Sequence, residues 1–280
     1  MRIVSFFSAK GGTGKTTFNL LFASYLRYRL GLRVLFLDFD GPEFNAYFVR
    51  QRELEHFNGD REGLYPIEYV EGERCRVEPG MTEEGRLRGK PGMTEGCRVE
   101  PGMTGFRGKP GMTKGSGMTG FTEKLRGLEG QLDYIVLDFA GSFSAEDAVC
   151  QLSLAGAIDL IVIPTELDSI TIASCKALSR TFAESGQKSM LFFNRVHGKE
   201  SDELYAKLFA WFEENHLYMS HNRVRNSLAM RRDAESGGVN YMRSSVCFPA
   251  GRIIRGNPDI IKLFDEVIEY VQGAKKIPWG

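Results

Sequence analysis

A glycine-rich stretch near the start of the chain constrains the fold more than any other feature. Residues 8–17 read Ser-Ala-Lys-Gly-Gly-Thr-Gly-Lys-Thr-Thr. A run of β-forming residues, 3–7, precedes this stretch, and an apolar pattern of helical period follows it from Lys15 onward. The sequence therefore predicts a strand, a tight loop and a helix in direct succession. Glycines let such a loop adopt positive φ and bring its N–H groups close to a polyphosphate at the helix N-terminus.

The residue types in this loop predict a binding site for a nucleoside triphosphate. Lys15 is placed to reach the β- and γ-phosphates, and the hydroxyl of Thr16 is placed to hold Mg²⁺. The nucleotide-binding residues expected from the loop are Gly11, Gly12, Thr13, Gly14, Lys15, Thr16 and Thr17. The alternative is a glycine-rich turn without a ligand, which also joins strands to helices in α/β proteins.

The order of residues 10–17 departs from the general phosphate-loop pattern, because Ala9 stands where that pattern has its first glycine. The stretch resembles instead the deviant Walker A motif of the ParA/MinD/Soj partition ATPases, whose additional signature lysine is Lys10 in this chain. The resemblance implies that Lys10 binds and acts on the phosphates of a nucleotide held by a partner subunit. It therefore implies an ATP-dependent homodimer, in which Lys10 and Lys15 are both catalytic.

Apolar, β-rich runs alternate with helical patterns along the rest of the chain. Strands are expected at 33–38, 134–138, 159–164 and 189–193, with a short or edge strand at 65–70. Helices are expected at 46–58, 122–131, 145–155, 170–185 and 258–270. This alternation predicts an α/β fold with a doubly wound, mainly parallel sheet and helices on both faces. The nucleotide is expected at the carboxyl edge of this sheet. The resemblance to the partition ATPases further implies a P-loop NTPase of the SIMIBI type.

Acids stand at the ends of two expected strands. By the resemblance, Asp40 positions the attacking water, Asp38 is a supporting acid near Mg²⁺, and Asp138 is the Walker B acid that holds Mg²⁺ through water. The alternative for the first two is a pair of acids that solubilise a strand end. The loops that follow depart from the family pattern, because residues 41–43 lack its Pro-Gln and residues 139–142 lack both of its prolines.

Asn194 follows the strand expected at 189–193. The resemblance places an adenine-reading asparagine at this position, and an amide suits that role because it donates and accepts hydrogen bonds at once. The alternative is an asparagine that caps a turn.

Residues 74–120 differ from the rest of the chain in their composition and in their repeated sequence. Cys-Arg-Val-Glu-Pro-Gly-Met-Thr occurs at 75–82 and again at 97–104, and Gly-Lys-Pro-Gly-Met-Thr at 89–94 and 108–113. Such repeats have too few apolar residues to offset the entropy of ordering. We therefore expect one ATPase domain, 1–280, interrupted at 74–120 by a low-complexity insertion; a methionine-rich binding tether is the alternative.

The stretch from 221 to 257 is locally basic. It contains Arg243 and the residues that we consider candidates for DNA contact, Arg223, Arg225, Arg231, Arg232, Arg252 and Arg255. In the chromosome-partition branch of the resembled family, basic residues in this half bind DNA phosphates without sequence preference. A solvated face or ion pairs within the domain explain the arginines nearly as well.

The amino-acid composition indicates the cellular compartment of the protein more than its function. Lys and Arg together number 36, as do Asp and Glu, so net charge favours neither nucleic acid nor membrane. No apolar run approaches the roughly 18 residues of a membrane span, and no signal peptide is evident. The five cysteines form no Cys-x-x-Cys pair, which favours reduced thiols in the cytoplasm. The apolar helix at 258–270 lacks a basic rim, which favours core packing over a membrane surface.

The sequence thus predicts a ParA-like ATPase that uses ATP, Mg²⁺, dimerisation and hydrolysis to switch DNA or partner binding in the maintenance of a plasmid, chromosome or mobile element. The resemblance implies slow turnover that a small DNA-binding partner protein stimulates, and nucleoid association if DNA binds. The alternatives are a membrane-associated MinD-like positioning ATPase and a metabolic relative, either a ligase or an electron-transfer ATPase.

Overall fold

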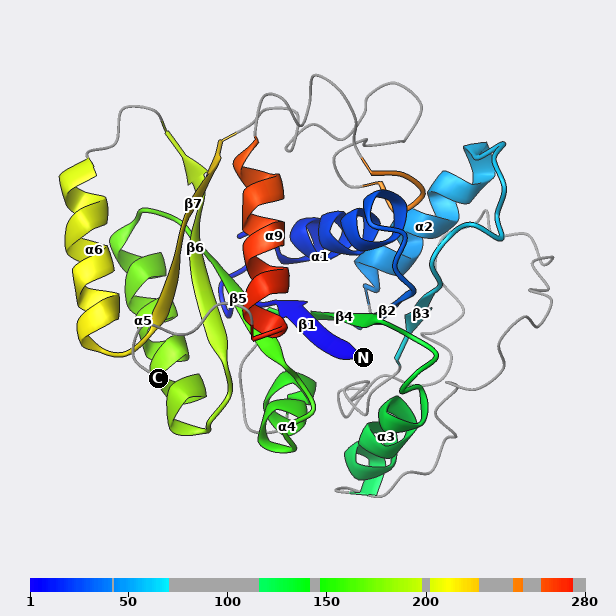
Figure 1. Cartoon of the computed structure of the whole chain (residues 1–280), viewed down its shortest axis with the longest axis horizontal. Helices are drawn as coiled ribbons and strands as arrows, with labels where there is room; N and C mark the ends of the chain where they lie inside the picture. Colours follow the sequence, from blue (N-terminus) through cyan, green and yellow to red (C-terminus); the bar gives the residue numbers. More distant parts are fainter. Residues whose placement is uncertain are drawn as a thin grey trace, which may run out of the picture.

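Seven parallel strands form a single sheet in the order β3-β2-β4-β1-β5-β6-β7 (Figure 1). The computed structural model describes residues 1–41, 43–70, 116–141, 147–197, 202–226, 244–248 and 258–273, without the side chains of 116–120. The strands are β1 (Arg2–Phe6), β2 (Val34–Phe39), β3 (Ile67–Tyr69), β4 (Tyr134–Phe139), β5 (Leu160–Thr165), β6 (Ser189–Val196) and β7 (Tyr218–Arg225). The predicted α/β fold with a parallel sheet is confirmed.

Helices cover both faces of the sheet. They are α1 (Lys15–Ser24) with its π-helical continuation η1 (Tyr25–Arg29), α2 (Asn45–His56), α3 (Ser116–Gly127), α4 (Ala148–Leu154), α5 (Ser169–Glu184), α6 (Asp202–Glu214) and α9 (Asp259–Val271). Side chains of β1 and of Phe7, which follows it, alternate between two apolar layers: Val4 and Phe6 pack with α1, η1 and α9, whereas Ile3 and Phe7 pack with α4, α5 and α6. The sheet is therefore doubly wound, as predicted.

The helix expected at the C-terminal end of the sequence packs into the core. On α9, Ile260, Leu263, Phe264 and Val267 are fully buried beside α1 and the sheet. A buried carboxylate, Glu266, accepts hydrogen bonds from Tyr218 (2.7 Å) and from other polar side chains of β7. Core packing of this helix is thus confirmed. Across the described ranges, no helix is both long and apolar enough to cross a membrane.

Several boundaries differ from the sequence prediction. Helix α3 begins at Ser116, inside the range assigned to the insertion, and ends at Gly127, earlier than expected. Helix α6 and strand β7 were not predicted, although Tyr205, Leu208 and Phe212 of α6 are spaced as a buried helical stripe. Strand β3 is the edge strand that was expected at 65–70. The repeats of residues 71–115 lie outside the described residues.

Candidate nucleotide site

The predicted strand, loop and helix are present, and the loop lies at the carboxyl end of the central strand β1. Gly12 (φ 76°) and Gly14 (φ 98°) adopt left-handed conformations, which side chains with a Cβ rarely tolerate. Helix α1 begins directly after Gly14, and the N–H of Phe18 donates to the carbonyl of Gly14 at 2.9 Å. The N–H groups of the first helical turn have no intrahelical acceptors, so this end of α1 is suited to an anion.

Lys15 extends from the first turn of α1 towards the acids at the ends of β2 and β4. Burial lowers the pKa of Lys15 below its ordinary value, and the charges of Asp138 and Asp40 oppose that shift. Its Nζ donates to the carbonyl of Lys10 at 3.4 Å. A Cβ added to Gly141 would lie 2.8 Å from this Nζ, so the backbone after β4 approaches the lysine as closely as a glycine allows.

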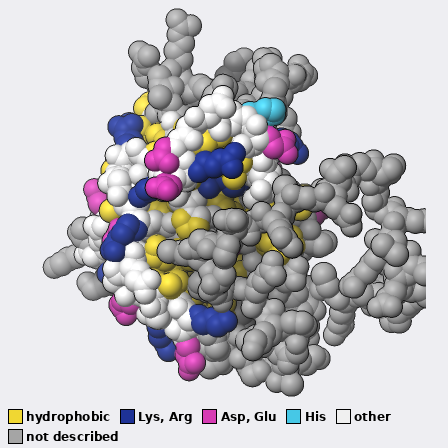
Figure 2. Space-filling view, turned by 90° about the vertical axis from the view of Figure 1, so that its right-hand side faces the viewer, with side chains coloured by type: hydrophobic (Ala, Val, Ile, Leu, Met, Phe, Trp, Pro, Cys, Tyr) yellow, Lys and Arg dark blue, Asp and Glu magenta, His cyan; other side chains and the backbone are white. Residues whose placement is uncertain are grey.

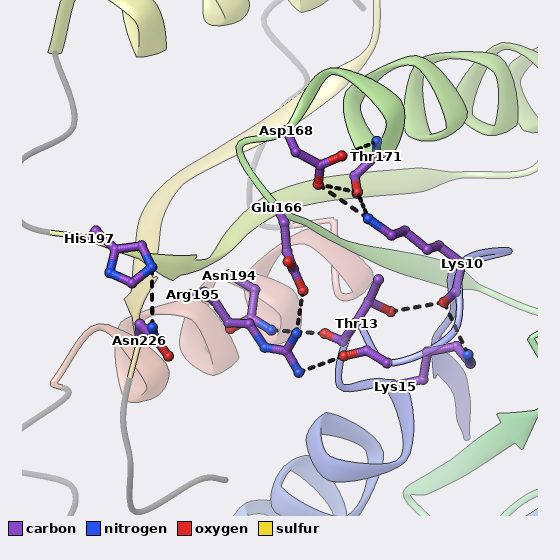
Figure 3. A network of polar contacts seen from close by, with 11 residues as sticks. Lys10, Thr13, Lys15, Glu166, Asp168, Thr171, Asn194, Arg195, His197 and Asn226 are labelled. Carbon is purple, nitrogen blue, oxygen red and sulfur yellow. Dashed lines mark hydrogen bonds and ion pairs between the residues drawn. The ribbon is translucent and has the colours of Figure 1, made fainter.

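Lys10 points away from Lys15, towards the N-terminus of α5 in the same chain (Figure 3). Its Nζ lies 3.2 Å from a carboxylate oxygen of Asp168 and also donates to the hydroxyl of Thr171. Asp168 caps α5 by accepting the N–H of Thr171 at 2.9 Å. Hydrogen bonds from Thr171 lower the pKa of Asp168 to about 2, with a smaller contribution from Lys10. The structure thus places Lys10 and Lys15 on the same loop but in different surroundings.

Asp138 is fully buried at the end of β4, beside α1. The amide of Asn19 donates to its Oδ1 at 2.8 Å, whereas its Oδ2 has no hydrogen-bond partner. Burial, followed by the neighbouring charge of Asp38, raises the pKa of Asp138 to about 8, and the hydroxyl of Thr16 opposes the shift. A buried carboxylate oxygen without a donor, next to a threonine hydroxyl, fits a Mg²⁺ site of oxygen ligands.

Asp38 is the register partner of Asp138 on the neighbouring strand. Its Oδ1 accepts the N–H of Asp40 at 3.0 Å, and its Oδ2 accepts the N–H groups of Ala46 (3.0 Å) and Tyr47 (3.1 Å). Asp38 therefore fixes the first turn of α2 and the loop before it. This capping role was not predicted, and the proposed role near Mg²⁺ stays a prediction.

Asp40 is half-buried at the start of the loop between β2 and α2. Its Oδ2 accepts a hydrogen bond from Asn45 at 3.2 Å, and its charge acts on Lys15. The position is compatible with the predicted orientation of a water near the phosphates. Among the residues that the structure describes, no group of three or more His, Cys, Asp and Glu forms a metal site; Mg²⁺ in nucleotide sites commonly keeps waters and phosphate oxygens as ligands.

Asn194 is buried at the end of β6 and contacts the glycine-rich loop directly. Its Nδ2 donates to the carbonyl of Thr13 at 2.8 Å, and its Oδ1 accepts the N–H of Arg195 at 2.8 Å. The guanidinium of Arg195 binds the carbonyl of Gly12 (2.5 Å) and the carboxylate of Glu166 (2.6 Å). Adenine recognition by Asn194 stays a prediction.

Three further residues of the site were not identified from the sequence. Asn19 joins α1 to Asp138 and also exchanges two hydrogen bonds with the backbone of Phe6. Glu166 and Arg195 each lie at or beside the end of a strand, and neither was assigned a role from the sequence. Their contacts connect residues more than a hundred positions apart or residues on different elements. Such contacts cannot be predicted from a local sequence pattern. The adjacency of Arg195 to Asn194 at a strand end was the one available signal.

The predicted DNA-contacting arginines are only partly described. Arg223 lies on β7, where it donates to Asp202 at 2.9 Å and stacks on the ring of Tyr205 at 3.8 Å. This ion pair is the alternative that the sequence left open for the arginines. Arg225 ends the same strand, whereas Arg231, Arg232, Arg243, Arg252 and Arg255 lie outside the described residues. On the face seen in Figure 2, acidic and basic side chains of the described residues are interspersed.

The parallel sheet, the glycine-rich loop at its central strand and the buried acid beside α1 define a P-loop nucleotide-binding domain. Residues 4–235 match the CbiA family, described as the CobQ/CobB/MinD/ParA nucleotide binding domain. The chain belongs to this family, as the resemblance in the loop predicted. Members of this superfamily bind and hydrolyse ATP. A comparison with curated protein sequences found no match.

Solved structures with the same fold come from several functional branches. A plasmid partition protein from Borrelia burgdorferi is 14% identical, with a TM-score of 0.51, and the match covers 95% of this chain and 98% of that one. The MinD cell division protein from Aquifex aeolicus is 14% identical, with a TM-score of 0.56 and 99% of each chain covered. Cobyrinic acid a,c-diamide synthase from Mycobacterium smegmatis is 15% identical, with a TM-score of 0.56 and 99% and 98% covered. At these identities the likeness shows the fold.

ATP and Mg²⁺ fit this family. The synthase from Mycobacterium smegmatis was crystallised with ADP and magnesium and with an ATP analogue and magnesium. The unsatisfied oxygen of Asp138 and the adjacent hydroxyl of Thr16 are compatible with the predicted Mg²⁺ ligands, and their role in metal binding stays a prediction.

Proposed function

We propose that this chain is a ParA-like ATPase in which ATP produces a homodimer and hydrolysis releases it. The dimer would bind DNA or a small DNA-binding partner protein during the maintenance of a plasmid, chromosome or mobile element. The observation that carries the proposal is the loop itself, where Lys15 is turned to the acids of β2 and β4 and a second lysine, Lys10, is turned outward to α5. A nucleotide site within one chain requires the first lysine, whereas the second could reach a neighbouring subunit once its contacts with Asp168 and Thr171 open.

The residues of the site divide the work of phosphoryl transfer. Backbone N–H groups at the start of α1 bind the phosphates, and Lys15 neutralises charge that develops on them. Mg²⁺, when bound, would be held by Thr16 and by Asp138 through water, and would neutralise phosphate oxygens. Asp40 orients the attacking water at the rim of the site. Positioning and charge neutralisation supply most of the catalysis in reactions of this class.

Two alternatives are favoured by particular observations. A MinD-like positioning ATPase is supported by the structural likeness to MinD, but α9 gives its apolar face to the core and is not free to lie on a membrane. A metabolic role is supported by the likeness to a synthase. The position of Lys10 has a use in an ATP-dependent dimer of either the partition or the MinD type, and the burial of the apolar face of α9 favours the partition switch.

A comparison of three lysine variants tests the proposal. In the presence of Mg²⁺ and a non-hydrolysable ATP analogue, size-exclusion chromatography should show a dimer for the wild type and a monomer for Lys10→Ala. Lys15→Ala should lose nucleotide binding, and its ATP hydrolysis should fall by a factor of about 10² to 10³. Lys207→Ala is the matched control, because Lys207 is an exposed lysine of α6 that pairs only with Glu203 among the described contacts. A dimer of Lys10→Ala would contradict the switch mechanism.

DNA retention tests the finer assignment. Nonspecific duplex DNA should retain the wild type only with ATP, and rising salt should release it steeply, because phosphate contacts displace counterions. Retention that does not depend on ATP, or no retention at any salt concentration, would favour one of the two alternatives.

A further inference from the structure

Two consecutive residues at the end of β6 hold two consecutive carbonyls of the glycine-rich loop. Arg195 donates from Nη2 to the carbonyl of Gly12 at 2.5 Å, and Asn194 donates from Nδ2 to the carbonyl of Thr13 at 2.8 Å. Figure 3 shows both side chains reaching across to the loop from β6. The contacts join residues about 180 positions apart in the sequence. The loop is therefore held by a strand that is not its neighbour in the chain.

The direction of these contacts matters for anion binding. In a planar trans peptide the C=O and the N–H of one unit point in opposite directions. When the carbonyls of Gly12 and Thr13 are turned towards β6, the N–H groups of Thr13 and Gly14 are turned away from it. Successive N–H groups that point to one side of a loop form a concave site for phosphate oxygens. The β6 contacts thus fix the orientation on which such a site depends.

The carboxylate of Glu166 balances the positive charge of Arg195 beside the glycine-rich loop. Its Oε1 lies 2.6 Å from Nη1 of Arg195, and both side chains are about one-quarter to one-third exposed, at 25% and 33%. The carboxylate holds the guanidinium in the plane that reaches the Gly12 carbonyl. It also offsets a positive charge that would otherwise be free to approach a phosphate directly. Glu166 follows β5, so β5 and β6 together support the loop.

The backbone at Arg195 is adapted to this task. Arg195 has φ 58°, a left-handed conformation that is uncommon for a residue with a Cβ. The hydrogen bond from its N–H to Oδ1 of Asn194 accompanies this turn. Strained residues of this kind persist when surrounding contacts determine them, and they concentrate at functional sites. Here the turn directs two neighbouring side chains of one strand end to the same loop.

We propose that Glu166, Asn194 and Arg195 form a loop clamp, a set of positioning residues that orients the Thr13 and Gly14 N–H groups for the β-phosphate of a nucleotide. The proposal rests on the proposed function, because it names residues that prepare the same site for its ligand. The clamp acts through the loop, and none of its members needs to touch the nucleotide. It therefore contributes to the affinity for nucleoside di- and triphosphates, whatever the base.

Variants of Arg195 and Glu166 test the clamp by equilibrium titration with fluorescent analogues of ATP and GTP. Arg195→Ala should lower the affinity for both nucleotides by about tenfold, so that the ratio of the two affinities is unchanged. Arg195→Lys should restore part of the loss, because an ammonium can still donate to the Gly12 carbonyl. Glu166→Ala should weaken binding less, and adding it to Arg195→Ala should cause no further loss, since the two residues act as one unit.

Arg33→Gln serves as the matched control, because Arg33 pairs with Asp133 at the start of β2, at the opposite edge of the sheet. A second measurement needs no nucleotide: amide hydrogen exchange of Thr13 and Gly14 in the free protein should be faster in Arg195→Ala than in Arg33→Gln. Thermal unfolding midpoints show whether a variant is simply less stable.

The outcomes separate the clamp from the proposed function. If the wild type binds ATP and Arg195→Ala binds it equally well, the clamp is wrong and the proposed function stands. A loss that follows the unfolding midpoint and is not restored by Arg195→Lys also overturns the clamp, since it indicates a structural role alone. A wild type that binds neither nucleotide overturns both, even where amide exchange is accelerated as expected.

Discussion

Lys10 and Asp168 form an ion pair of 3.2 Å between the glycine-rich loop and the N-terminus of α5. Both side chains are about two-fifths exposed, at 39% and 43%, so the pair contributes little to stability. This ion pair competes with the proposed dimer, because the dimer needs the amine of Lys10 at the nucleotide of a partner subunit. The intramolecular pair must therefore open before the dimer can form.

Removing the charge of Asp168 should favour the dimer. Asp168→Asn keeps a residue that caps helices well but no longer attracts the ammonium of Lys10. Because an exposed pair is worth about 0.2–1 kcal/mol and each of the two protomers must open one, the protein concentration at half-dimerisation should fall by about 2- to 30-fold. Analytical ultracentrifugation with a non-hydrolysable ATP analogue measures this concentration. An unchanged midpoint would show that the pair does not compete with assembly.

Replacing Gly141 should disturb Lys15 without disturbing the fold. A Cβ at this position would lie 2.8 Å from Nζ of Lys15, and the flexible end of that side chain would have to move. A displacement of about 1 Å can cost up to 10²-fold in rate, so Gly141→Ala should slow ATP hydrolysis by about 10- to 100-fold. Gly127→Ala is the control, since nothing lies within 4 Å of its Cβ. Equal phosphate release by both variants would argue against a close approach.

Neutralising Asp138 should separate stability from activity. Asp138→Asn keeps an oxygen that can accept from Asn19 and removes a buried carboxylate whose other oxygen has no donor. Nucleotide-free protein should gain on the order of 1 kcal/mol in urea unfolding, while Mg²⁺-dependent hydrolysis should fall by about 100-fold or more. Retained hydrolysis would remove Asp138 from the metal site.

Asn194→Ala distinguishes two roles of one side chain. Both polar atoms of the Asn194 side chain bind protein groups. The loss of the Thr13 contact should therefore lower the affinities for ATP and GTP by the same factor. Competition titrations with the two nucleotides give the ratio. A loss confined to ATP would support adenine reading in place of the loop contact.

The ion pair between Arg33 and Asp133 should be visible in the acid stability of the protein. A hydrogen bond from Arg33 lowers the pKa of Asp133 to about 2. A carboxyl with a depressed pKa in the folded state stabilises the fold above its unfolded pKa of about 4 and loses that contribution as pH falls towards 2. Asp133→Asn should therefore flatten part of the acid limb of urea stability between about pH 4 and pH 2, and Arg33→Gln should do the same. An unaltered limb in both would contradict the assignment.

Local sequence patterns were sufficient to predict the glycine-rich loop. Features that depend on contacts between residues far apart in the sequence could not be predicted in this way. The loop could be read from the sequence because its glycines, lysine and threonines are contiguous and both flanking elements have clear periodicity. The sheet was predictable because β2, β4 and β5 begin with at least four consecutive apolar or aromatic residues, and β1 is apolar apart from Arg2 and Ser5. Strand β7 was not predicted, since its Ser220, Asn222 and Arg223 obscure the apolar alternation and are satisfied by Glu266 and Asp202.

The same distinction applies within the site. Asp138 was found because it ends an apolar strand, but the amide of Asn19 that binds it stands inside an ordinary helical pattern. Asp38 was assigned from its strand end, yet its contacts to Ala46 and Tyr47 depend on how α2 begins. Residue type and position thus indicate which groups are present, whereas the partners of each group depend on the packed sheet.

The position of β3 at the edge of the sheet bears on how the fold accommodates the long sequence between β3 and α3. The long stretch between β3 and α3 follows the last strand in the sheet order, and the strands on either side of it in the sequence, β3 and β4, do not pair with each other. Each doubling of a flexible loop costs only on the order of 0.6 kcal/mol in closure entropy. Repeats could therefore be gained or lost between β3 and α3 in the sequence over evolutionary time, while the strands that carry the nucleotide loop and its acids keep their order.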